Sequence, residues 1–258
     1  MKEMMLGTVL TDLQRRAGIE AVIRSRTLRT WGESESGLAE LLAERIYELD
    51  ARGNPTLAFL ASGAEGLKVR ITAKAESDEA VDALLAEQAE RVRLILGDEL
   101  IFSFDDQPME AVVLDQCKQR GLSLGVAESL TGGLIGARLT SVPGASACFK
   151  GSVVSYASEV KADLLGVPPG PVVSEEAVMA MAEGAARVLD ADVTVAVTGV
   201  AGPDPQDGQE VGRVWMATSL NGNVQTNTVK WPFDRDRIRQ FTTITVLNAL
   251  RLRLLRES

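Results

Sequence analysis

Two side chains near the middle of the sequence have the chemistry of a nucleophile and its base. Ser129 follows an apolar run and precedes two glycines, and Lys161 follows further along the chain. A serine hydroxyl needs a base to take its proton, and a buried lysine amine can serve because burial lowers its pKa. Tyr156 is close to Lys161 in sequence and could relay the proton. Alternatively, Ser129 or Thr131 caps a helix, Lys161 lies on the surface and Tyr156 lies in the core.

The chain contains no histidine. This excludes the Ser-His-Asp triad, the Cys-His dyad and histidine-ligated metal sites. Any general base must then be a lysine, aspartate, glutamate, tyrosine or terminal amine. Two cysteines, Cys117 and Cys148, are too few for a disulfide framework or a cysteine zinc site. We therefore expect neither a histidine-ligated nor a cysteine-ligated metal site.

The charge of the chain is acidic, with a formal net charge of −9 and a pI near 4.8. This argues against a general affinity for nucleic acid or anionic membranes. The first residues lack the apolar core of a signal peptide, and no apolar run approaches the length of a membrane span. We expect a cytoplasmic protein with neither a nucleic-acid nor a membrane partner.

Three predicted strands end in stretches that carry polar groups or glycines. In open α/β sheets, ligands bind outside the carboxyl ends of the strands, so we expect these stretches to lie together. They are Glu128–Gly133, Tyr156–Lys161 and Thr198–Asp204. In the first, the backbone N–H groups of Thr131, Gly132 and Gly133 open a predicted helix and could hold a developing oxyanion.

Two further features suit a phosphate or a ribose. The turn from Gly199 to Asp204 could cradle either, although a plain connection between strand and loop is equally consistent with the pattern. Arg235 and Arg239 lie in the last predicted helix, where an arginine could clamp a phosphate. The alternative is a surface ion pair with Asp234.

The elements that must position these residues divide at about Asp105–Pro108. In the second half, helices alternate with buried strands before a hairpin through Asn221-Gly222, a type I′ turn signal. This order predicts an α/β domain over residues 107–258 with three layers and a mixed sheet. The predicted helices are 109–120, 132–139, 159–165, 175–189 and 234–256, and the predicted strands are 122–127, 152–157, 192–198, 211–220 and 223–230.

The first half predicts a smaller α+β domain over residues 18–106 with an antiparallel sheet. A separate helix is expected at residues 1–17. The predicted order is strand 19–30, helix 33–50, strands 56–61 and 67–75, helix 78–96 and strand 99–104.

Two motifs in the first half suggest nucleic acid only weakly. Arg24, Arg26 and Arg29 lie on one predicted strand and could meet phosphate as a row, or could form an ordinary solvated face. Gly63-Ala64-Glu65-Gly66 matches the GxxG loop of RNA-binding KH domains. It lies between strands and carries an acidic residue, so we interpret it as a hairpin turn.

Three motifs in order resemble the C-terminal domain of the competence/damage-inducible CinA family. They are Ala127–Gly133 (AESLTGG), Gly151–Lys161 (GSVVSYASEVK) and Thr198–Pro203 (TGVAGP). The resemblance covers about residues 109–258. It implies a nicotinamide mononucleotide deamidase, which releases nicotinic acid mononucleotide and ammonia by a serine–lysine mechanism without a metal.

Matched to these motifs, Ser129 is the implied nucleophile, Lys161 the base and Tyr156 the assisting residue. The resemblance also implies a small-molecule nucleotide as substrate and, from relatives, a homodimer. The implied substrate-binding residues are Glu128, Thr131, Gly132, Gly133, Thr198, Gly199, Ala201, Gly202 and Arg235.

Residues 19–104 resemble the KH-like middle domain of full-length CinA proteins. Those proteins carry a further N-terminal domain similar to molybdopterin-binding domains, with ADP-ribose pyrophosphatase activity. The resemblance implies that residues 1–17 are the last helix of that domain, which is otherwise missing here. The pyrophosphatase activity is therefore not carried over.

Two positions depart from the family pattern. Phe233 replaces a usual glycine and could crowd the site or move Arg235, and Arg213 replaces a small residue and could add charge toward a phosphate. The departure at Phe233 leaves an alternative open, in which the domain is inactive and binds a nucleotide or partner in the competence or DNA-damage response.

Overall fold

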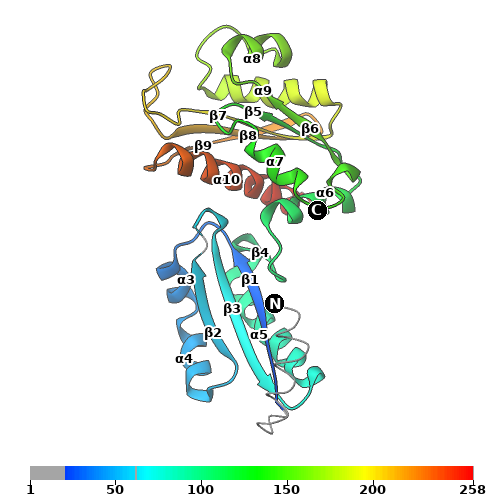
Figure 1. Ribbon diagram of the computed structural model, residues 1–258, viewed down its shortest axis with the longest axis vertical. Coiled ribbons are helices and arrows are strands. Elements are labelled where there is room, and N and C mark those ends of the chain that lie inside the picture. Colours follow the sequence, from blue (N-terminus) through cyan, green and yellow to red (C-terminus); the bar gives the residue numbers. More distant parts are fainter. Residues whose placement is uncertain (1–20, 62, 258) are drawn as a thin grey trace, which may run out of the picture. The chain divides into compact units, whose positions relative to one another are not determined.

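The computed structural model describes residues 21–61 and 63–257. The chain forms two compact units, one ending at Asp106 and the other beginning at Gln107 (Figure 1). The helix predicted for residues 1–17 lies outside the described residues. No helix among the described residues is both long and apolar enough to span a membrane.

The first unit is an antiparallel sheet in the order β2-β3-β1-β4, with helices packed on it (Figure 1). This confirms the predicted α+β class and the strand–helix–strand–strand–helix–strand order. Its elements are β1 (Val22–Thr30), α3 (Glu35–Leu41), α4 (Ala43–Arg52), β2 (Thr56–Ala61), a 3₁₀ turn (Gly63–Glu65), β3 (Leu67–Ala75), α5 (Asp78–Leu100) and β4 (Ile101–Ser103).

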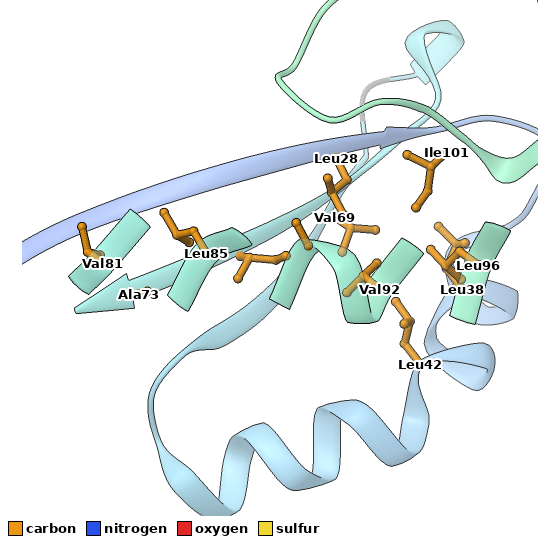
Figure 2. Packing of buried hydrophobic residues seen from close by; sticks show 12 residues of the cluster. Leu28, Leu38, Leu42, Val69, Ala73, Val81, Leu85, Val92, Leu96 and Ile101 are labelled. Carbon is orange, nitrogen blue, oxygen red and sulfur yellow. The ribbon is translucent and has the colours of Figure 1, made fainter. Parts of the chain in front are cut away.

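The core of this unit follows from the alternation along β3. Val69, Ile71 and Ala73 are fully buried and face the apolar side of α5, where Val81 and Val92 lie among them (Figure 2). The side chains between them, such as Arg70 and Lys74, are exposed. The apolar residues at every second position of β3 thus pack against the apolar residues that recur at helical spacing on α5, and together they form one apolar layer.

Two predictions for this unit need correction, and a third is confirmed. The helix predicted for residues 33–50 is two helices that meet at Leu42, where ψ is 7°. The helix from Asp78 does not end at Gly97, which has φ 76° and ψ 162°; helical hydrogen bonding resumes after this kink and continues to Leu100. The turn at Gly63–Glu65 joins β2 to β3 as a hairpin, as expected.

The arginines of β1 do not form a row. Side chains alternate along a strand, so Arg29 lies on the opposite face from Arg24 and Arg26. All three meet carboxylates. Arg24 binds Asp78 and Asp82, Arg26 lies 3.8 Å from Asp105, and Arg29 binds Glu65. Their charges are therefore matched within the unit rather than presented together to phosphate groups.

The second unit is a three-layer α/β domain around a mixed sheet in the order β6-β5-β7-β8-β9. This confirms the predicted class. Helices α8 and α9 lie on one side of the sheet, and α6, α7 and α10 lie on the other (Figure 1). Its elements are α6 (Met109–Gln119), β5 (Leu124–Glu128), α7 (Leu134–Thr140), a 3₁₀ turn (Ala145–Ala147), β6 (Phe149–Val154), α8 (Ser158–Leu165), α9 (Glu175–Leu189), β7 (Val193–Gly199), β8 (Arg213–Leu220), β9 (Asn223–Lys230) and α10 (Arg235–Arg256).

Strand β5 pairs in parallel with both β6 and β7, and β7, the central strand, pairs in antiparallel with β8. The carboxyl ends of β5, β6 and β7 therefore meet at one edge of the sheet. The predicted type I′ turn is also present, because Asn221 and Gly222 have φ values of 49° and 83°.

Candidate functional site

Ser129 lies immediately after β5, in a tight turn. Its N–H donates to the carbonyl of Val197 on β7, and its own carbonyl accepts from Gly132 N–H at 3.0 Å, which closes a four-residue turn. Gly132 and Gly133 have φ values of 60° and 94°, a conformation that favours glycine. The helix predicted to start at Gly132 therefore begins only at Leu134, and Ser129 lies ahead of it with 9% of its surface exposed.

The carboxylate of Glu128 is fully buried and holds this turn against the start of α7. It accepts hydrogen bonds from the backbone N–H groups of Gly133, Ile135 and Gly136 and from the hydroxyl of Ser152, at 2.8–3.1 Å. A negative group at a helix N-terminus also complements the helix dipole. The structure gives Glu128 a role in holding the turn, since its oxygens have partners in the protein and it does not line the cavity described below. Its predicted contact with substrate stays a prediction.

The predicted oxyanion donors need correction. The N–H of Gly133 is bonded to Glu128 and that of Gly132 to the carbonyl of Ser129. The Thr131 hydroxyl is buried without a partner among the described residues and lies outside the cavity. The N–H groups of Leu130 and Thr131 make no hydrogen bond to any described residue, so they are the free donors of this turn.

Lys161 lies on α8 and is almost completely buried, with 2% of its surface exposed. Its Nζ donates to the backbone carbonyl of Tyr156 at 3.2 Å. Burial lowers the pKa of the Lys161 amine, since a desolvated ammonium is disfavoured, while the carboxylates of Asp207 and Glu159 oppose this shift. Lys161 is therefore not a surface lysine. At a given pH, a larger fraction of its amine is neutral than for a lysine in water.

Tyr156 contributes different atoms to Lys161 and to the rest of the site. Its carbonyl faces Lys161, but its hydroxyl accepts a hydrogen bond from Arg235 Nη2 at 2.8 Å. The side chain is 60% exposed, so it is not a core residue. Arg235 also donates to the carbonyl of Gly202 at 2.6 Å. The hydroxyl that was expected to relay a proton to Lys161 is therefore paired with a cation instead.

The end of β7 lines part of the site. The Thr198 hydroxyl donates to the carbonyl of Val172 at 2.7 Å and fixes the loop before α9. A Cβ at Gly199 would lie 2.7 Å from the carbonyl oxygen of Arg213 on β8. Only glycine allows this close approach of the two backbones, which explains the residue type at this position in structural terms.

These groups surround one cavity of about 200 Å³. Larger hollows exist, including one of about 390 Å³ over β8, β9 and the end of α10, but that hollow contains none of the three strand ends. The cavity brings together eight of the predicted residues, and Glu128, Thr131, Gly132 and Gly133 are not among its lining. The eight are Ser129, Tyr156, Lys161, Thr198, Gly199, Ala201, Gly202 and Arg235.

Sequence reasoning gave no role to two residues that shape this cavity. Asp207 accepts hydrogen bonds from the N–H groups of Val172 and Val173 and lies near enough to Lys161 to influence its pKa. It belongs to an irregular loop without periodicity, so no sequence signal could have identified it. Gln206 lines the cavity from the same loop.

The two departures from the family pattern do not reach the cavity. Phe233 stacks between Trp231 and Phe241, with ring centroids 5.8 and 4.8 Å away, and the guanidinium of Arg237 lies over its ring. Neither Phe233 nor Arg213 lines the cavity. The expectation that Phe233 crowds the site is therefore wrong.

Among the described residues, no cluster of three or more carboxylate or cysteine groups could hold a metal ion.

Comparison with known proteins places both units in one family. Residues 106–254 match the model of the CinA C-terminal domain, and residues 25–101 match that of the damage-inducible protein CinA KH domain. A CinA-like protein of Frankia casuarinae is 44% identical over 256 residues, and one of a Synechococcus species is 40% identical over 262 residues. These matches cover 97% and 98% of this chain but 59% and 61% of the relatives, so the chain spans about three fifths of their length.

Solved structures match the second unit. The competence damage-inducible protein A from Klebsiella pneumoniae is 30% identical with a TM-score of 0.56, and the alignment covers 58% of this chain and 97% of that one. The competence/damage inducible protein CihA from Agrobacterium tumefaciens is 35% identical with a TM-score of 0.54, covering 57% and 93%. The chain therefore belongs to the CinA family.

Proposed function

We propose that this protein hydrolyses the carboxamide of nicotinamide mononucleotide to nicotinic acid mononucleotide and ammonia. The observation that carries this proposal is the pair of Ser129 and buried Lys161 in one cavity, in a chain without histidine. A serine needs a base, and a lysine with a lowered pKa is the base that this cavity offers. The motif resemblance supports the choice of substrate.

In the proposed mechanism, Ser129 Oγ attacks the carboxamide carbon and the neutral Lys161 amine takes the hydroxyl proton. Negative charge develops on the carboxamide oxygen, which accepts a hydrogen bond from the free N–H group of Leu130 at the cavity. The Lys161 ammonium then returns the proton to the leaving nitrogen. The C–N bond breaks, ammonia departs and Ser129 carries the acyl group.

Water completes the cycle through the same groups. Lys161 takes a proton from the water as its oxygen attacks the ester carbon. The second tetrahedral intermediate collapses when the proton is returned to Ser129 Oγ, which releases the carboxylic acid. No step uses a metal, and the tyrosine hydroxyl is not required as a relay because Lys161 serves both as base and as acid.

The charged end of the substrate is assigned to Arg235. Its guanidinium lies at the cavity, is exposed and makes hydrogen bonds to two neutral oxygens, the Tyr156 hydroxyl and the Gly202 carbonyl. A phosphate would form stronger, charge-assisted hydrogen bonds with this group. Because Tyr156 is bonded to Arg235, we assign Tyr156 to orienting this cation as well.

The proposal is tested by ammonia release from nicotinamide mononucleotide. We expect Ser129→Ala to lower kcat by about a thousandfold or more and Lys161→Ala by about a hundredfold or more. Lys150→Ala is the control, because this lysine is exposed on β6 outside the cavity; its rate should equal that of the wild type. A wild-type protein that binds the nucleotide without releasing ammonia would instead identify a binding module.

A further inference from the structure

Arg239 was considered as a phosphate clamp, but its side chain points back to the turn that carries Ser129. Its Nε donates to the carbonyl of Leu130 at 3.0 Å, and its Nη2 donates to the carbonyl of Thr131 at 3.0 Å. The third nitrogen, Nη1, lies 3.7 Å from Asp236. Only 27% of the side chain is exposed. The guanidinium thus holds two successive carbonyls of the turn, as a fork.

These two contacts fix the orientation of two peptide planes. In a trans peptide the carbonyl and the following N–H point in opposite directions. The bond to the Leu130 carbonyl therefore turns the Thr131 N–H away from α10. The bond to the Thr131 carbonyl likewise fixes the Gly132 N–H, which closes the turn onto the carbonyl of Ser129 at 3.0 Å.

We propose that Arg239 is a positioning residue. By holding the carbonyls of Leu130 and Thr131 it fixes the turn that presents the Leu130 N–H at the cavity, and thereby the stabilisation of the oxyanion formed when Ser129 attacks. This inference rests on the proposed amidohydrolase function. The Gly132 N–H that this fork fixes is bonded to the Ser129 carbonyl, which belongs to the same peptide as the Leu130 N–H, so the arginine also holds that donor in place. A lysine cannot reproduce the effect, because its single ammonium lacks the planar fork of a guanidinium.

The same helix provides a matched control. Arg237 carries an equal charge two residues earlier, but its guanidinium lies 4.3 Å from the centroid of Phe233 and makes no hydrogen bond through its side chain to the Ser129 turn. Comparing Arg239→Met with Arg237→Met therefore separates the fork on the turn from the general effect of losing a cation near the N-terminus of α10.

The first measurement is kcat and KM for ammonia release. We expect Arg239→Met to lower kcat by about a hundredfold, the size found when one oxyanion donor is lost, with KM within about twofold of the wild type. Arg239→Lys should recover little of this loss, and Arg237→Met should match the wild type. Thermal melting of each variant verifies that it is folded. Unchanged kcat in a folded Arg239→Met protein overturns the proposal, as does full recovery in Arg239→Lys.

A second measurement does not depend on the substrate. A fluorophosphonate probe phosphonylates an activated serine, and mass spectrometry gives the rate at Ser129. We expect this rate to fall in Arg239→Met and to stay unchanged in Arg237→Met. If the wild type releases no ammonia but shows this pattern of labelling, the proposed function fails and the positioning role stands. Equal labelling of Ser129 in the wild type and a folded Arg239→Met protein overturns the positioning role, even if ammonia release is confirmed.

Discussion

At the scale of single residues, the site depends on how Lys161 is held. Its ammonium is buried against one backbone carbonyl, and the nearby carboxylates of Asp207 and Glu159 only partly offset the cost of burial. The pKa of Lys161 is therefore lowered, and the neutral base is available at a lower pH than for a lysine in water. In the proposed reaction, kcat/KM should rise with pH as Lys161 loses its proton.

Replacing Asp207 with asparagine tests this assignment. The carboxylate favours the protonated form of Lys161, so its removal should lower the pKa of Lys161 further and move the rising limb of the pH–rate profile to lower pH. The asparagine oxygen can still accept from Val172 and Val173, and asparagine tolerates the φ of 54° at this position. The measurement is kcat/KM against pH for wild type and Asp207→Asn.

Asp163→Asn serves as the control, because Asp163 is an exposed carboxylate on the same helix as Lys161. Its profile should overlay that of the wild type. A profile of Asp207→Asn that stays in place, or moves to higher pH, would exclude Lys161 as the group that titrates.

Residue types predicted much of this site, but they did not predict the direction in which each side chain points. Serine, lysine and the Gly199 turn could be selected because their chemistry is local to the side chain. The roles of Glu128 and Arg239 could not, because each depends on backbone groups that the fold brings to it. Arg239 lies one helical turn after Arg235, so their shared face was predictable. The partial burial of Arg239 and the exposure of Arg235 were not.

At the scale of elements, α8 must be held in register for Lys161 to reach the cavity. Helix α9 packs against its end through Gly184. A Cβ at Gly184 would lie 2.2 Å from the carbonyl oxygen of Leu165, the last residue of α8. The obstacle is backbone, so α8 and α9 would have to separate.

Because the Cβ would meet backbone at 2.2 Å, we expect Gly184→Ala to cost about 3 kcal/mol through overpacking. The higher helix propensity of alanine returns about 1 kcal/mol, so the free energy of unfolding should fall by about 2 kcal/mol. The substitution should also lower kcat, since a shift of α8 moves Lys161. Urea denaturation and the ammonia assay measure the two effects.

Gly37→Ala provides the comparison. There the three nearest atoms all belong to the exposed side chain of Glu33, which can move aside at the cost of its hydrogen bonds to Ser34. The gain in helix propensity offsets this cost, so stability should stay about unchanged. If Gly184→Ala is as stable as Gly37→Ala, then α8 and α9 are not in the close contact described.

Elements were predictable where the signal is short-range. The buried run of β7 and the helix starts at Asp78 and Glu175 appear at the expected positions, and Ser77 and Ser174 cap these two helices. The predicted start of α7 at Gly132 was two residues too early, because the sequence does not show that Gly132 and Gly133 belong to the turn before the helix. The strand order could not be deduced, since β5 lies between two strands that follow it in the sequence.

At the scale of the whole molecule, every residue that lines the cavity belongs to the unit from Gln107 to Ser258. The proposed reaction therefore needs only this unit. We expect a protein made of residues 107–258 to release ammonia with the kcat and KM of the full chain. A folded fragment without activity would show that residues 1–106 supply part of the reaction; circular dichroism and thermal melting establish whether it is folded.

The contact between Arg239 and Leu130 joins residues that lie 109 positions apart. During synthesis at about 5–20 residues per second, Arg239 is added roughly 5 to 20 s after Leu130. For that interval the growing chain already carries Ser129 and Lys161, yet the turn has no guanidinium to hold its carbonyls. If the proposed role of Arg239 holds, the proposed reaction therefore becomes efficient only after the last helix has been made.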